Sequence, residues 1–100
     1  MIIIKNNLIR HELPFEYVIT GHAGYAETGS DIVCSAVSCL HYSFIKWLSE
    51  RGIQFSCSDD GSILAVSVDD EHARSCFEMV IAGFEGISGV YGDNVKIVYT

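Results

Sequence analysis

Apolar and polar residues alternate along this chain in two ways, one typical of strands and the other of helices. Five segments are rich in Ile, Val, Phe and Tyr, and they cover residues 1–10, 15–20, 53–58, 62–68 and 95–99. Such residues favour strands. A polar stretch around Pro14 separates the first two segments, and Asp59-Asp60-Gly61, a strong turn signal, separates the next two. Short turns join antiparallel neighbours, so the sequence predicts two hairpins.

Two further segments repeat apolar residues at helical spacing. The first repeat runs from Val33 to Leu48 and stops at Arg51-Gly52, while Ser30 or Asp31 can cap its first turn. The second is a stripe of Ala73, Cys76, Phe77, Val80 and Phe84 that follows a cap at Asp69 or Asp70. Glycines in its later turns weaken the second helix and leave its end undefined.

The predicted order is β-β-α-β-β-α-β, which indicates an α+β fold. We expect a five-stranded, mainly antiparallel sheet with both helices on one face. The chain has 100 residues, 49% of them hydrophobic, and a single Pro, so residues 1–100 are predicted to form one domain. A core of this size leaves apolar residues for a subunit interface, which is compatible with a homodimer.

Composition and charge indicate in which cellular compartment the protein lies and which kinds of partner it binds. Lys5 interrupts the apolar start, which is shorter than the ~7 to 15 apolar residues of a signal peptide or the ~20 of a membrane span, so we expect a cytoplasmic protein. Its four cysteines should be reduced there, and none has C-x-x-C spacing, so no metal or other cofactor is expected. The net charge of −7 disfavours nucleic acid and would attract a basic partner, although acidic surfaces also serve solubility.

Candidate chemistry is concentrated where a glycine-containing loop meets the first helix. Residues 21–30 show neither the strand nor the helix spacing of apolar residues, so they are predicted to form a mobile loop. This loop carries His22, and Gly21, Gly24 and Gly29 are its flexible points. Cys34 follows in the first helical turn, where free backbone N–H groups and the helix dipole favour a thiolate. Because Val33 and Val37 supply the core stripe, Cys34 should lie at its margin with Ser38 and His41. The simpler interpretation is a small buried cysteine.

Among the four histidines, His22 is the preferred general base. His41 lies seven residues after Cys34, about 10 Å along the same helix, beyond the roughly 3 Å that proton transfer requires. His11 at a turn and His72 at an exposed helix start are typical surface histidines. The loop of His22, in contrast, ends where the helix of Cys34 begins.

Two neighbours of Cys34 have open roles. Asp31 could orient His22 or only cap the helix, and its charge would oppose a thiolate unless the carboxylate faces the imidazole or backbone N–H groups. Ser38 could contact substrate or return its hydroxyl to a carbonyl of its own helix. Cys39, Cys57 and Cys76 are assigned to structure.

The segments 21–26, G-H-A-G-Y-A, and 29–38, G-S-D-I-V-C-S-A-V-S, resemble the signature of the ribosomal-processing cysteine proteases, the Prp family. Length and element order agree over the whole chain. The resemblance implies a cysteine endopeptidase that removes an N-terminal extension from the large-subunit ribosomal protein L27 during ribosome assembly. It places the catalytic dyad on His22 and Cys34 and the motif's Asp and Ser on Asp31 and Ser38, and it implies a homodimer whose loop closes over the peptide.

Backbone N–H groups at the helix start would then be the oxyanion donors. The sequence departs from the family pattern at Ser35 and Cys39, where small residues such as Ala are expected, and the extra thiol leaves redox sensitivity open. Two other interpretations also stay open: a non-catalytic ribosome-assembly module for a basic protein, and a thiol redox sensor that needs Cys34 but not His22.

Overall fold

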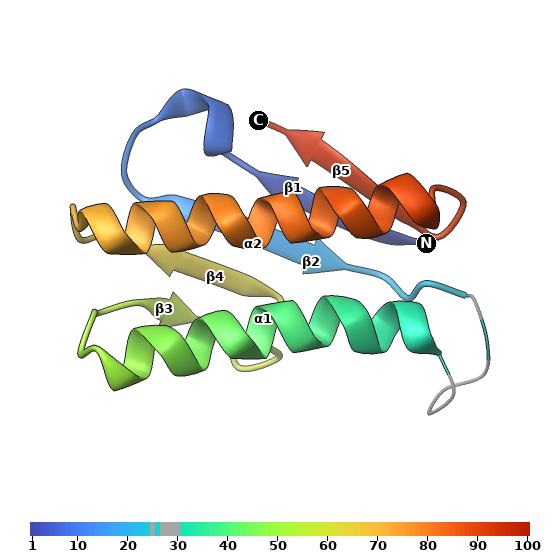
Figure 1. Cartoon of the computed structure of the whole chain (residues 1–100), viewed down its shortest axis with the longest axis horizontal. Coiled ribbons are helices and arrows are strands. Elements are labelled where there is room, and N and C mark those ends of the chain that lie inside the picture. The colour runs from blue at the N-terminus through green and yellow to red at the C-terminus, as the bar shows by residue number, and fades with distance from the viewer. Residues whose placement is uncertain (25, 27–30) are drawn as a thin grey trace.

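The computed structural model describes residues 1–24, 26 and 31–100, and its elements occur in the predicted order (Figure 1). The strands are β1 (Ile2–Asn6), β2 (Phe15–Thr20), β3 (Ser56–Cys57), β4 (Ile63–Val66) and β5 (Val95–Tyr99). The α-helices are α1 (Ile32–Glu50) and α2 (Glu71–Val90), and a 3₁₀ helix, Leu8–Arg10, adds an element that was not predicted. Both α-helices lie over the same face of the sheet, as expected (Figure 1).

The sheet is mixed, with the strand order β3-β4-β2-β1-β5. Neighbouring strands pair antiparallel except at one edge, where β5 runs parallel to β1. The expectation of a mainly antiparallel sheet is therefore corrected to a mixed one. The reason is the connection through α2, which carries the chain from β4 back across the sheet, so that β5 runs in the direction of β4 and β1.

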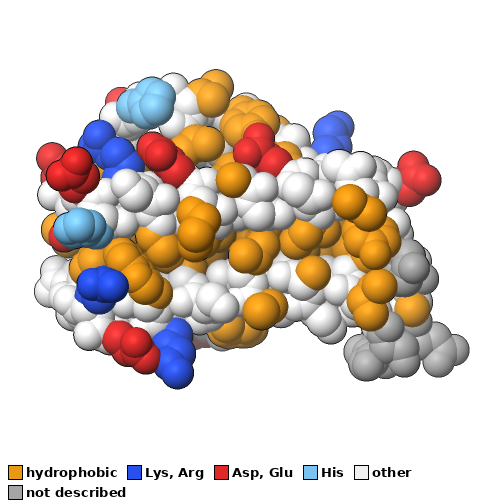
Figure 2. Space-filling model, in the orientation of Figure 1, with side chains coloured by type: hydrophobic (Ala, Val, Ile, Leu, Met, Phe, Trp, Pro, Cys, Tyr) orange, Lys and Arg blue, Asp and Glu red, His pale blue; other side chains and the backbone are white. Residues whose placement is uncertain are grey.

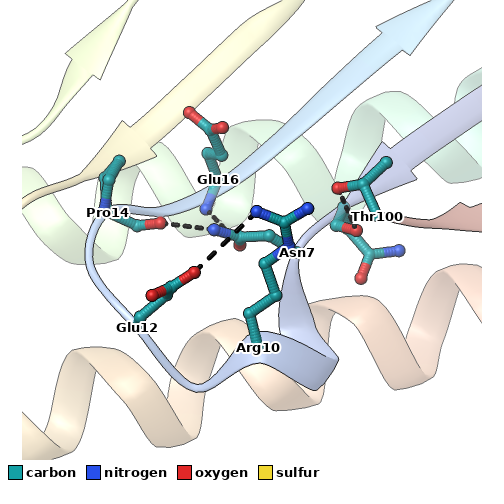
Figure 3. Close-up of polar contacts among 7 residues, drawn as sticks. Asn7, Arg10, Glu12, Pro14, Glu16 and Thr100 are labelled. Carbon is teal, nitrogen blue, oxygen red and sulfur yellow. Dashed lines mark hydrogen bonds and ion pairs between the residues drawn. The ribbon is translucent and has the colours of Figure 1, made fainter.

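The first strand ends at Asn6 rather than at the predicted residue 10. The side chain of Asn7 bonds the opposite segment here: its amide nitrogen donates to the Pro14 carbonyl (2.6 Å), and its oxygen accepts from the Glu16 N–H (3.0 Å) (Figure 3). Asparagine favours turns through such bonds. The predicted hairpin of β1 and β2 still forms, with Ile4 opposite Ile19.

Each helix begins directly after an aspartate that caps it. Asp31 accepts the N–H groups of Val33 and Cys34, and Asp70 accepts that of Ala73. These bonds satisfy backbone donors that have no partner within a helix. Of the glycines in α2, Gly83 has a packing role, since a Cβ there would lie 2.7 Å from Leu40 Cδ1 of α1. Its missing side chain lets the two helices pack closely.

The core lies between the sheet and the two helices. Tyr17 of β2 is fully buried at its centre, with ring centroids 5.4 to 6.4 Å from those of Phe44, Phe77 and Phe84. Burying each such ring contributes about 1.5–3 kcal/mol. By length and composition α1 is apolar enough to cross a membrane, and its stripe from Val33 to Leu48 is what packs against the sheet here.

Candidate active site

The loop that carries His22 leaves β2 through a position that requires glycine. Gly21 has φ +84°, and a Cβ there would collide with the carbonyl oxygen of Met1. Gly24 also has a positive φ of +68°. Both therefore adopt a backbone conformation that favours glycine, and the predicted mobility of this loop stays a prediction. Gly29, the third predicted flexible point, lies outside the described residues.

Asp31 fixes the other end of the loop onto α1. Its Oδ1 accepts the N–H groups of Val33 (2.9 Å) and Cys34 (3.0 Å), and its Oδ2 accepts that of Ala26 (3.5 Å). Asp31 is 6% exposed and its carboxylate faces backbone N–H groups, which is the condition under which its charge is compatible with a nearby thiolate. The structure identifies Asp31, of the two predicted candidates, as the helix cap, and its role toward His22 stays a prediction.

Cys34 is half-buried in the first turn of α1, beside the loop. The backbone N–H of Ala23 donates to its Sγ at 3.4 Å. On the other side of the same residue, the Ala23 carbonyl accepts from the side-chain amide of Asn94 at 2.9 Å. Ala23 itself is 3% exposed, so the segment next to His22 is fixed against the sulfur.

One cavity of about 330 Å³ unites most of the predicted site residues. It is lined by His22, Gly24, Ala26, Asp31, Cys34, Ser35 and Ser38. His22, which is exposed, and Cys34 thus line the same space, one from the loop and the other from the helix. The hydroxyl of Ser38 has no hydrogen-bond partner among the described residues, and the expected return to a helix carbonyl occurs instead at Ser35, which donates to the Asp31 carbonyl (3.0 Å).

The prediction that His41 lies at the margin of the helix beside Cys34 is wrong. His41 belongs to the buried stripe, in the register of Val37 and Phe44, while Leu40 is only half-buried. Its Nδ1 lies 2.6 Å from the Tyr17 hydroxyl. Burial raises the pKa of Tyr17, so this hydroxyl keeps its proton. Burial also lowers the pKa of His41, with the Gly61 backbone opposing, so His41 is a neutral core residue.

The remaining histidines and cysteines lie away from this cavity. His11 and His72 are exposed, as predicted. Cys39 and Cys57 are also exposed, and Cys76 is half-buried, where desolvation raises the pKa of its thiol despite the positive charge of Arg51. Desolvation disfavours the thiolate, the reactive form, which supports a structural assignment for Cys76.

Other cavities among the described residues offer less chemistry. One of about 510 Å³, at the edge formed by β3 and β4, is lined by Ile53, Gln54, Phe55, Ser56, Ala65, Ser67 and Val68. Hydrophobic side chains also gather along the seam between α1 and α2, where a cavity of about 170 Å³ lies (Figure 2). Neither is lined by a histidine or an acidic residue. The cavity of His22 and Cys34 alone among these three combines a thiol with an imidazole.

The contributors to the site that sequence reasoning did not assign include Ala23, Asn94 and Ser35. Ala23 acts through its backbone, which no residue pattern reveals. Asn94 lies 71 positions further along the chain and reaches Ala23 only because β5 pairs with β1. Ser35 was noted as an unusual residue, and its position one after Cys34 was the available signal that it lines the same cavity.

Removing the Asp31 cap should both destabilise the fold and disturb the thiol. We expect Asp31→Ala to lower the free energy of unfolding by about 0.5–2 kcal/mol, the usual loss for a helix cap, and to slow the alkylation of Cys34. Asp70→Ala, at the cap of α2, is the matched control and should cost similar stability with no change at Cys34. Urea unfolding followed by circular dichroism, together with mass spectrometry of alkylated protein, measures both quantities. Equal alkylation rates in the two variants would show that Asp31 only caps.

The arrangement suits thiol-based acyl transfer, because a cysteine at a helix start, an imidazole and a backbone N–H donor surround one space. The family model of cysteine protease Prp matches residues 1–96. The ribosomal processing cysteine protease Prp of Mycoplasma genitalium is 27% identical over 96 residues, which cover 94% of this chain and 93% of that protein.

Among solved structures, the ribosomal processing protease Prp of S. aureus with a covalently linked product peptide matches with a TM-score of 0.81 at 21% identity. The S. aureus protease with a substrate peptide matches with a TM-score of 0.74 at 20% identity, and both comparisons cover each chain completely. These likenesses show a common fold. Since the family model matches nearly the whole sequence, the chain belongs to the Prp family of cysteine proteases.

Proposed function

We propose that this cysteine protease removes an N-terminal extension from the large-subunit ribosomal protein L27 during ribosome assembly, with Cys34 as the nucleophile and His22 as its base. The observation that carries the proposal is the shared cavity. His22 lines it from the loop and Cys34 from α1, and the Ala23 N–H donates to the sulfur. The proposal places the enzyme in the cytoplasm as a homodimer.

The chemistry follows from these groups. His22 takes the thiol proton of Cys34, and the sulfur attacks the scissile carbonyl carbon, so that a C–S bond forms while the carbonyl electrons move to oxygen. When the intermediate collapses, the C–N bond breaks and His22 returns the proton to the departing amine. Water, deprotonated by His22, then releases the acyl group and restores the thiol. Ser38 and Ser35 line the cavity and are available to hydrogen-bond the peptide.

The relatives and the charge support the substrate. The Mycoplasma genitalium relative is named a ribosomal processing protease, and the S. aureus protease was solved with a substrate peptide and with a covalently linked product peptide. L27 itself is implied by the resemblance of the 21–38 segment to the family signature. Ribosomal proteins are basic because they bind RNA, and a chain of net charge −7 attracts such a partner electrostatically.

The test combines a cleavage assay with a measurement of thiol reactivity. Purified protein is incubated with a peptide carrying the L27 N-terminal extension and with a scrambled peptide, and the products are identified by mass spectrometry. We expect cleavage of the first only. In parallel, iodoacetamide at neutral pH should alkylate Cys34 faster than the other three thiols. Since Cys39 and Cys57 are exposed and Cys34 is half-buried, accessibility alone predicts the opposite order.

The outcomes separate the alternatives. Binding of the peptide without cleavage, together with equal alkylation rates, would favour the non-catalytic assembly module. Cleavage of both peptides at equal rates would exclude recognition of the extension. Size-exclusion chromatography with light scattering tests the dimer, and fractionation of cells that express the chain tests the cytoplasmic location.

A further inference from the structure

Three backbone donors in the first turn of α1 are already in use. Asp31 Oδ1 accepts the N–H groups of Val33 and Cys34, and the Asp31 carbonyl accepts that of Ser35 at 3.1 Å. The expectation that donors at the helix start stabilise the oxyanion stays a prediction, and at any of these three groups an oxyanion would have to displace a bond that holds the helix start in place.

The N–H of Ala23 is a donor that does point at the reacting atom. It lies 3.4 Å from Cys34 Sγ, and it comes from the loop rather than from the helix. A tetrahedral intermediate places its oxygen two bonds from this sulfur. The same N–H can therefore serve the thiolate first and the oxyanion afterwards, with little movement of the backbone.

The direction of that N–H depends on how the peptide on either side of Ala23 is fixed. The Ala23 carbonyl accepts from the amide nitrogen of Asn94 at 2.9 Å. Asn94 is itself anchored through its main chain, because its N–H donates to the Tyr91 carbonyl and its carbonyl accepts from the Ile2 N–H, each at 2.8 Å. A substitution of Asn94 thus removes the bond to Ala23 and leaves these two bonds in place.

We propose that Asn94 is a positioning residue for catalysis: it holds Ala23 so that the Ala23 N–H stabilises the Cys34 thiolate and then the oxyanion. This inference rests on the proposed function, since it takes Cys34 as the nucleophile. In the step concerned, the C–S bond forms, the carbonyl electron pair moves to oxygen, and that oxygen accepts the Ala23 hydrogen bond that the sulfur gives up. Collapse breaks the C–N bond, and the amine leaves with the proton from His22.

The test compares Asn94, which bonds the first residue of β1, with Asn7, which follows the last residue of that strand. Asn94→Ala removes the bond to Ala23, and Asn94→Asp keeps the shape while a carboxylate cannot donate. Both should lower kcat by about 10- to 100-fold, less than the roughly 10²–10³ that follows direct loss of an oxyanion donor, with KM nearly unchanged. The pH profile of Cys34 alkylation should move to higher pH in both. Asn7→Ala, which also loses an amide-to-carbonyl bond, should leave kcat and the profile as in wild type.

Asn94→Asp decides the question if Asn94→Ala proves too unstable to purify. Wild-type kcat and alkylation in a folded Asn94 variant would overturn the inference, and so would an effect on KM alone or an equal effect of Asn7→Ala. A different result would contradict the proposed function, namely cleavage of the L27 peptide by Cys34→Ala. Loss of activity in Cys34→Ala beside an unaffected Asn94→Asp would therefore reject the positioning role and retain the protease site.

Discussion

Cys34→Ala is expected to abolish cleavage of the L27 peptide while the fold stays intact. Without the sulfur no covalent acyl intermediate can form, so kcat/KM should fall by more than about 10³-fold. Cys34 is half-buried, and Ala fills most of its volume, so the loss of stability should be small. Mass spectrometry of the peptide products measures the activity, and urea unfolding measures the stability.

The matched control for this variant is Cys39→Ala on the same helix. Cys39 is exposed and lies outside the cavity lining, so its removal should leave kcat/KM unchanged. The same variant tests redox sensitivity, because protection from inactivation by peroxide in Cys39→Ala would assign that sensitivity to Cys39. Cleavage by Cys34→Ala at the wild-type rate would exclude Cys34 as the nucleophile.

The second large effect is expected for His22→Ala. Loss of the general base should lower kcat by about 10²–10⁴-fold, because the thiol proton and the leaving amine then exchange only with water. His22 is exposed on its loop, so unfolding free energy should change by no more than about 0.5 kcal/mol. Initial rates at several pH values measure the effect, and cleavage by His22→Ala should increase as the pH is raised, since solvent then ionises the thiol.

His72→Ala is the control, since His72 is also exposed and lies at the start of α2. The double variant of His22 and Cys34 should be no slower than Cys34→Ala alone, because the two side chains act in one step. Full activity in His22→Ala would show that His22 takes no part in the mechanism. If iodoacetamide still alkylates Cys34 rapidly in that variant, the result would favour a thiol redox sensor.

Local patterns in the sequence were sufficient for the elements that depend on neighbouring residues. The hairpin of β1 and β2, both helices, and a cap at Ser30 or Asp31 follow from spacing and capping chemistry, which act within a few residues. The same local information placed His22 and Cys34 at the two ends of one loop, and the structure finds them at one cavity.

Two predictions were wrong, the position of His41 at the helix margin and the end of β1, because local sequence patterns allow two nearly equivalent arrangements at each place. At the centre of α1, Leu40 and His41 both fit the helical spacing, and Leu40 is the more hydrophobic of the two. In the folded protein His41 is the buried one of the two, because the Tyr17 hydroxyl lies in the core and requires a hydrogen-bond partner, which the imidazole supplies at 2.6 Å. Likewise, the end of β1 depends on the Asn7 side chain, whose bonds to Pro14 and Glu16 exist only once the hairpin has formed.

By itself, then, the sequence determined the α+β class, the helix that presents Cys34, and the glycine-containing loop that carries His22. Only the tertiary structure decided that β5 runs parallel to β1, and this pairing brings Asn94 to the Ala23 carbonyl. The physical reason is that periodicity and capping operate over a few residues, whereas a backbone N–H aimed at a sulfur is fixed by contacts between segments far apart in the chain.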